Sequence, residues 1–178
     1  MRWEWDVEGD SRVSDLWHWK SELSESGKVV YSKWYNGRAT FFSRQVYTAL
    51  LTYFSARKAA EHLDRESREI FQILQMDSPL STKQLREASG LKGKALSSTY
   101  DRALKQLWRK FLIVGYGEVD DGAFPSLAVG SSQHLFEDLW EASQEISNVE
   151  AEMQLRARLD GTLFWKKMEK ELHAQKSL

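Results

Sequence analysis

Glu66-Ser-Arg-Glu-Ile-Phe-Gln-Ile-Leu-Gln-Met76 opens the stretch that decides the fold of this 178-residue chain, and the stretch runs on to Val129. Ile70, Ile73 and Leu74 recur at helical spacing, with Phe71 loosely on the same side, so residues 66–76 are predicted to form an amphipathic helix. Asp77-Ser-Pro-Leu80 follows. Proline has no N–H and disfavours helical backbone at the residue before it, so the helix is expected to end here.

A second, short helix is predicted directly after this break. Ser81-Thr-Lys-Gln84 has the spacing of a capping box, in which the two side chains each bond a free backbone N–H at the start of a helix. Leu85 and Ala88 are expected to face inward. Gly90 lies where a helix commonly ends in left-handed backbone, a conformation that glycine adopts without steric cost.

A third helix is expected after the turn Leu91-Lys-Gly-Lys94. Its apolar residues repeat at intervals of three and four, which places them on one face of a helix. They are Leu96, Tyr100, Ala103, Leu104, Leu107, Trp108 and Phe111. The opposite face carries Lys94, Ser98, Arg102, Lys105 and Arg109.

Two apolar, β-prone runs complete the stretch. Phe111-Leu-Ile-Val-Gly-Tyr116 and Phe124-Pro-Ser-Leu-Ala-Val129 are predicted to pair as strands across Glu118-Val-Asp-Asp-Gly122. Three helices closed by a hairpin are the plan of the winged helix-turn-helix. In such folds the third helix is usually the one presented to the major groove of DNA.

Charge is distributed unevenly along the chain, although its net charge is only -1. Residues 83–110 hold eight basic residues and two acids, a net charge of +6, whereas residues 114–162 hold ten acids and two arginines, a net charge of -8. A basic surface of this kind is the electrostatic footprint of a nucleic-acid binder. The alternative is that these lysines and arginines form only the solvated face of two amphipathic helices.

The basic segment predicts a binding surface for duplex DNA on the third helix. Its groove-facing residues are expected to be Lys94, Ser97, Ser98, Arg102 and Lys105. The residues expected to meet phosphates are Lys83, Lys92 and Arg109. Serines near the helix start suit backbone or water-mediated contacts better than a strong base code, so the sequence specificity is expected to be modest.

Acidic residues oppose a simple DNA-binding interpretation. Glu118-Val-Asp-Asp-Gly122, at the predicted tip of the wing, would be repelled by phosphate, so the wing is expected to stay off DNA. Asp101 also lies near the outward face of the third helix. A second hypothesis is therefore a non-enzymatic module that binds another protein or a second copy of the chain through exposed tryptophans or the C-terminal helices.

The regions on either side of residues 66–129 are also predicted to be ordered. Before them, Ser14 is expected to cap a helix to about Leu23, and Asn36-Gly37 joins the β-prone runs 29–35 and 38–42, the strongest short signal for a hairpin. Ser43 is expected to cap a further helix. The predicted fold is thus α+β, mainly α, with a Trp-rich N-terminal region at 1–65, a winged helix-turn-helix at 66–129 and C-terminal helices at 130–178.

Composition excludes several classes of protein. The chain has no cysteine, hence no disulfide and no thiolate chemistry, and it has no long apolar run, which together suggest a cytoplasmic protein without a membrane span. Its four histidines are far apart, and no nucleotide-loop or hydrolase motif is present, so no metal, cofactor or catalytic residue is predicted.

Five aromatic residues are expected to fill a core, with the wall of a base-binding pocket as the alternative. They are Trp17, Trp19, Trp34, Tyr53 and Phe54.

Several segments together resemble a known family. They are Leu16-Trp-His-Trp-Lys-Ser-Glu-Leu-Ser24, Tyr31-Ser-Lys-Trp-Tyr-Asn-Gly-Arg-Ala-Thr-Phe-Phe-Ser43, Pro79-Leu-Ser-Thr-Lys-Gln-Leu-Arg86, Asp101-Arg-Ala-Leu-Lys-Gln-Leu107 and Ile113-Val-Gly115. The chain is similar, over residues 14–140, to winged-helix proteins related to AlkZ or YcaQ, bacterial DNA glycosylases that unhook crosslinks and excise alkylated bases. The resemblance implies a DNA-binding relative.

The resemblance does not extend to a clear catalytic motif. The glycosylases carry Gln-x-Gln or Gln-x-Asp, which activates or positions the attacking water. Gln75-Met-Asp77 fits the second pattern, but it lies at the end of a predicted helix, where it is expected to be ordinary surface. A repair enzyme acting on alkylated DNA is therefore kept only as a third hypothesis, and no catalytic residue is assigned.

Overall fold

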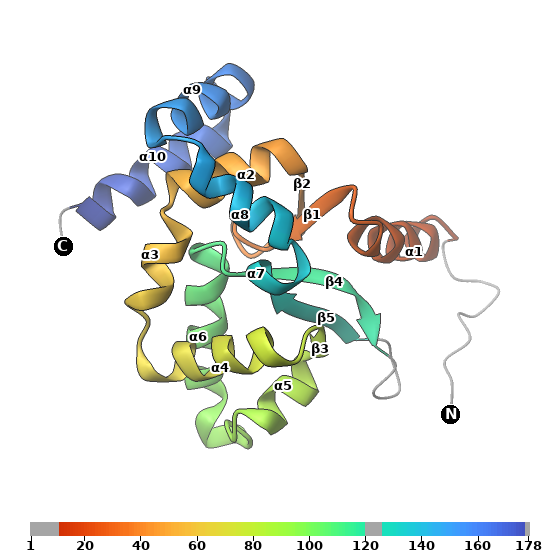
Figure 1. The fold of residues 1–178 in the computed structure, drawn as a ribbon. Helices are drawn as coiled ribbons and strands as arrows, with labels where there is room; N and C mark the ends of the chain where they lie inside the picture. Colours follow the sequence, from red (N-terminus) through yellow and green to blue (C-terminus); the bar gives the residue numbers. More distant parts are fainter. Residues whose placement is uncertain (1–10, 120–125, 177–178) are drawn as a thin grey trace.

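The computed structural model describes residues 11–119 and 126–176 of the chain. They form an α+β fold in which helices surround an antiparallel sheet with strand order β2-β1-β4-β5-β3 (Figure 1). The α+β class expected from the sequence is confirmed. The elements are α1 Ser11–Glu25, β1 Val29–Ser32, β2 Thr40–Ser43, α2 Arg44–Tyr53, α3 Ala56–Glu61, α4 Arg65–Met76, β3 Leu80–Ser81, α5 Thr82–Ala88, the 3₁₀ turn η1 Lys94–Leu96, α6 Ser97–Arg109, β4 Ile113–Val119, β5 Ser126–Ser131, α7 Ser132–Leu135, α8 Glu137–Glu145, α9 Asn148–Leu159 and α10 Leu163–Lys176.

Helices α4, α5 and α6 begin and end close to the predicted positions. The capping box of α5 is present, since the Ser81 hydroxyl accepts from the Gln84 N–H at 3.0 Å and the Gln84 side chain accepts from the Ser81 N–H at 2.8 Å. Gly90 has the left-handed backbone expected of it, with a φ of 67°.

Two inward positions were predicted wrongly. Ala88 is exposed, because it is the last residue of α5 and lies beyond the part of the helix that packs inward through Leu85. Leu96 is 40% exposed. It belongs to the 3₁₀ turn that precedes α6, so the helical spacing that groups it with Tyr100 does not apply.

The strand pairing predicted after α6 is confirmed. β4 and β5 pair antiparallel from Ile113 opposite Ser131 to Val119 opposite Ser126. The short strand β3, between α4 and α5, adds to the same sheet by pairing with β5. Most of the predicted acidic tip, from residue 120 on, lies outside the described residues.

The N-terminal hairpin joins this sheet through β1, where Tyr31 pairs with Gly115 of β4. The Asn36-Gly37 turn is present, with φ values of 54° and 69°. The strands end sooner than predicted, because β1 and β2 pair only from Val29–Ser43 to Ser32–Thr40. Trp34 leaves the ladder to enter the core, where it is 3% exposed, so the connection between the strands is longer than the turn itself.

Gly115→Ala is expected to lower the free energy of unfolding by about 1–3 kcal/mol, because a Cβ there overpacks the sheet. That atom would lie 2.1 Å from Cδ1 of Tyr31, whose ring is buried and has edge contacts with Phe41 and Trp108. Urea unfolding measures the loss. In a Tyr31→Val background the same substitution should cost much less, and an undiminished loss would exclude the clash as its cause.

Aromatic side chains from distant parts of the chain build the core. Trp34 stacks on Phe111 with ring centroids 5.5 Å apart and contacts Phe164 at 4.9 Å. The Tyr47 hydroxyl lies 3.1 Å from the Phe111 carbonyl oxygen, to which it can donate, and 2.8 Å from the Ser132 hydroxyl. Burial raises the pKa of Tyr47 well above its usual range. Loop, helix and C-terminal elements therefore share one core.

Helix α1 departs from its prediction in two ways. It begins at Ser11 and not at Ser14. Trp19 was expected to be buried, yet it is 59% exposed. The helix packs on β4 through Lys20 and Ser24, which are one turn apart, and this leaves Trp19 on a neighbouring side of the helix that faces solvent. Trp34 and Phe54 are buried as expected.

Of the C-terminal helices, α8 and α9 pack on α2, and α7 lies beside β5 (Figure 1). Ser147 and Glu150 form a second capping box at the start of α9. α9 ends at Leu159, and Gly161 follows it with a φ of 75°, which separates α9 from α10. Within the described residues, no helix is long and apolar enough to cross a bilayer.

Candidate nucleic-acid interface

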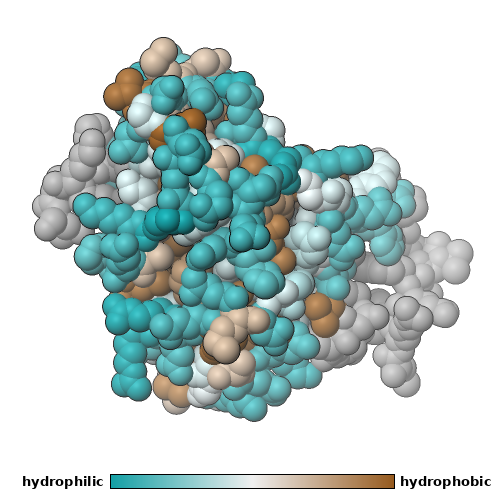
Figure 2. Space-filling view, in the orientation of Figure 1, coloured by the Kyte–Doolittle hydropathy of each residue, from teal (hydrophilic) through white to brown (hydrophobic). Residues whose placement is uncertain are grey.

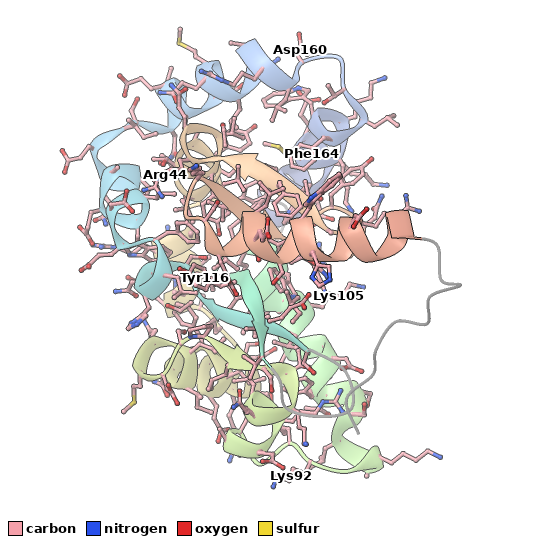
Figure 3. All side chains as sticks on the ribbon, turned by 90° about the vertical axis from the view of Figure 1, so that its right-hand side faces the viewer. Arg44, Lys92, Lys105, Tyr116, Asp160 and Phe164 are labelled. Atoms are coloured by element: carbon pink, nitrogen blue, oxygen red, sulfur yellow. The ribbon has the colours of Figure 1, made fainter. Side chains whose placement is uncertain are left out.

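Helix α6 has one buried and one exposed side, as its sequence pattern predicts. Tyr100, Ala103 and Leu107 are at most 1% exposed. The opposite side places Ser98, Arg102, Lys105 and Arg109 in solvent, and we call these four residues the α6 face. Figure 3 shows Lys105 on this helix, well above Lys92 at the lower end of the molecule. The chain thus displays a row of cations on a rigid helix.

Contacts with α5 fix the position of α6. The Tyr100 hydroxyl donates to the Thr82 carbonyl oxygen at 3.0 Å, and burial raises the pKa of Tyr100 to about 12. The guanidinium of Arg86 lies 4.4 Å above the same ring. Gly93, with a φ of 86°, allows the chain to turn between the two helices. Helix, turn and helix therefore form one rigid unit.

The Asp101 carboxylate is neutralised within this unit. It accepts from Arg86 at 2.9 Å and from the Ser97 hydroxyl at 3.5 Å. The acid that opposed DNA binding in the sequence is thus paired with a cation from the neighbouring helix. Ser97, predicted to face the groove, is half-buried and has its hydroxyl directed to this carboxylate.

Arg102 lies close to a second acid. Partial burial acts to raise the pKa of Asp64, but hydrogen bonds from Ser67 and the nearby cations Arg102 and Lys110 outweigh it and lower that pKa. Asp64 also caps α4, where it accepts from the Ser67 N–H at 2.8 Å. Arg102 itself is exposed and lies near the middle of α6.

A small basic groove lies beside the start of α6, with a volume of about 340 Å³. We call it the α5 groove, and it is lined by Thr82, Lys83, Arg86, Glu87, Lys92 and Gly93. Lys92 forms an ion pair with Glu87 at 3.5 Å. The structure therefore brings together Lys83 and Lys92, two of the residues predicted to meet phosphates.

A larger groove, of about 600 Å³, lies beside the C-terminal half of α6. The β1–β2 connection forms one side and α10 another, and we call it the α6–α10 groove. Lys105 and Arg109 both line it, and Arg109 forms an ion pair with Glu171 of α10. Its other lining residues are Lys33, Trp34, Asn36, Gly37, Asp101, Leu104, Trp108, Lys167 and Glu171.

The residues predicted to bind DNA fall into three places. Lys83 and Lys92 lie in the α5 groove, and Lys105 and Arg109 line the α6–α10 groove. The remaining four lie on the α6 face or at the start of α6. The last set is Lys94, Ser97, Ser98 and Arg102. Lys33 and Lys167 were missed. Neither lies in a basic run near α6, and only the packing of Trp34 against the core brings them beside it.

Acidic and metal-binding groups elsewhere add little to this surface. Glu118, near the end of β4, is 12% exposed and lies 3.6 Å from Lys20 of α1, so its charge is directed into the molecule. Among the described residues, no group of three or more His, Asp or Glu side chains is arranged to hold a metal ion.

Fold and surface together define an α+β protein that displays a basic helix face beside a small antiparallel sheet. The chain belongs to the AlkZ-related family, whose model, described as "AlkZ related", matches residues 3–175. Searches of curated proteins and of solved structures found no match to this chain.

Proposed function

We propose that this chain is a non-enzymatic, winged-helix DNA-binding protein that contacts duplex DNA through α6 and is related to DNA repair proteins of the AlkZ type. The order α4-β3-α5-α6-β4-β5 supports the winged-helix assignment, because β3 and β4 both pair with β5. Three helices and a three-stranded antiparallel sheet then make one unit, with α6 in the place of the recognition helix.

The observation that carries the proposal is the α6 face. Arg102 and Lys105 are exposed there, while the nearby Asp101 is paired with Arg86. Phosphate contacts from lysine and arginine supply most of the non-specific affinity for DNA. In this proposal Lys94, Ser97, Ser98, Arg102 and Lys105 face the major groove, and Lys83, Lys92 and Arg109 meet phosphates.

The environment of the Gln-x-Asp string favours binding without catalysis. The Gln75 amide donates to the Gln133 side chain at 2.7 Å, and Asp77 is the exposed C-cap of α4. Neither residue lines the α5 groove or the α6–α10 groove. A water-activating pair needs a cavity that admits the damaged nucleotide beside it.

Fluorescence anisotropy with a labelled random duplex, titrated at several salt concentrations, tests the proposal. If Lys83, Lys92 and Arg109 meet phosphate, the slope of log affinity against log salt should have a magnitude of at least about 2.7. Arg102→Glu should weaken this binding, and its matched control is Lys58→Glu, which makes the same change of charge at an exposed lysine on α3. Absence of binding at low salt would exclude the DNA-binding function.

A protein-binding module is the second candidate, and one observation favours it. Val149 and Met153 of α9 and Leu163 of α10 are 69%, 66% and 73% exposed. Figure 2 shows hydrophobic residues at the surface near the top of the view, where Figure 1 places α9. Val149→Ser/Met153→Ser should leave DNA binding unchanged and should abolish any self-association seen by sedimentation.

A further inference from the structure

Three lysines in the α6–α10 groove form no ion pair with any acid of residues 11–119 or 126–176. Asp101 and Glu171, the two acids of the lining, pair with Arg86 and Arg109. No carboxylate of the described residues forms an ion pair with Lys33, Lys105 or Lys167, which come from the β1–β2 connection, α6 and α10. Within the part of the chain that the structure describes, the groove therefore carries positive charge that no carboxylate neutralises.

One of these lysines is held in place, and a second is half-buried. The Lys167 ammonium donates to the Asn36 side-chain oxygen at 2.6 Å and lies 5.3 Å from the ring centres of both Trp34 and Tyr35. Burial, and then the nearby charge of Lys20, lowers the pKa of Lys33. A cation that is partly desolvated and close to another cation is stabilised by a bound anion.

The aromatic residues of the groove are not free to stack on a nucleobase. Trp34 and Trp108 are only 3% and 8% exposed. Trp34 is stacked on Phe111, and its indole N–H donates to the Arg109 carbonyl oxygen at 3.1 Å. Stacking of a base requires an accessible ring face. The groove therefore offers cations to a ligand and not an aromatic platform.

We infer that the α6–α10 groove binds backbone phosphates of the DNA strand that leaves the α6 face, with Lys33 and Lys167 as phosphate contacts outside the winged unit. The inference rests on the proposed function. Lys105 belongs to both surfaces, so a strand in contact with Arg102 continues into the groove along the helix. Arg102 and Arg109 are seven residues apart, or about 10 Å along α6. The β1–β2 connection and α10 thus extend the surface of the protein that contacts DNA.

The test is the salt dependence of duplex binding by Lys33→Gln/Lys167→Gln, which leaves the α6 face intact. Loss of two phosphate contacts should reduce the slope of log affinity against log salt by about 1.8, so the affinity ratio between about 50 and 200 mM salt should shrink roughly tenfold. Lys33→Gln alone, which leaves the cation–π contacts of Lys167 in place, should shrink that ratio three- to fourfold, or about 0.9 in slope. The control Lys58→Gln/Lys166→Gln removes two exposed lysines and should leave the slope unchanged.

The outcomes separate this inference from the proposed function. If Arg102→Glu weakens binding while both groove variants keep the wild-type slope, the groove does not contact DNA and the function stands. If the wild-type chain binds no duplex, both fail. The groove could instead bind the phosphate of a free nucleotide. A titration with deoxyadenosine monophosphate, followed by the ¹H–¹⁵N shifts of the indole N–H groups, tests for this. Lysine-dependent binding of this nucleotide without an effect on DNA would overturn the assignment to a DNA strand.

Discussion

Arg102→Glu is expected to lower the affinity for a random duplex by about 10- to 100-fold at roughly 50 mM salt. Arg102 is exposed at the middle of α6, between Ser98 and Lys105. The substitution removes one cation from the α6 face and places a carboxylate near Asp64, whose pKa the Arg102 charge helps to lower. The loss should diminish as salt rises, because the missing interaction is electrostatic. Anisotropy titrations at two salt concentrations measure both effects.

Two comparisons make the Arg102 result specific. Lys58→Glu on α3 changes the net charge equally and should alter the affinity by less than about twofold, because exposed charges beyond a Debye length are screened. Arg102→Lys keeps the charge and loses the planar fork, so it should bind random DNA nearly as well, because non-specific affinity depends mainly on charge. Equal losses for Arg102→Glu and Lys58→Glu would show that net charge, and not α6, governs the affinity.

Local signals allowed the central helices to be predicted. The capping box of Ser81 and Gln84 and the left-handed Gly90 act within a few residues, so their effects are visible in the sequence itself. The pairing of β4 with β5 follows from two β-prone runs close together in the chain. The burial of Ala88 and Leu96 was predicted wrongly. Both lie where a helix ends or begins, and there the direction of a side chain departs from the helical pattern.

The parts of the surface that decide its charge depend on distant contacts. Asp101 opposes DNA in the sequence, and only the packing of α5 on α6 shows that Arg86 neutralises it. Lys33 and Lys167 are 134 positions apart in the sequence. They line the same groove because Trp34 and Phe164 pack together in the core. Helical periodicity carries no information about such pairs, so it predicted the α6 face and missed two of the four cations in the groove beside it.

Phe111→Ala is expected to lower the free energy of unfolding by about 3–5 kcal/mol, a large share of the stability of a domain of this size. The side chain is fully buried. Its ring contacts Trp34, Phe42, Tyr47 and Phe54 at centroid distances of 5.1 to 6.2 Å. The four rings come from the β1–β2 connection, from β2 and from α2 with its C-cap, so removal of the Phe111 ring leaves a cavity among them. Urea unfolding, followed by tryptophan fluorescence, measures the loss.

A glycine variant separates the ring from the backbone at this position. Phe111 has a φ of 55°, and it ends α6 in a Schellman motif, in which its N–H donates to the Trp108 carbonyl oxygen and the Leu112 N–H to that of Leu107. Left-handed backbone costs a residue with a Cβ roughly 1–2 kcal/mol and costs glycine almost nothing. Phe111→Gly loses the same ring contacts, yet it should be about 1 kcal/mol more stable than Phe111→Ala. If alanine is the more stable of the two, the end of α6 does not keep this left-handed turn, and the helix is not anchored to β4 through it.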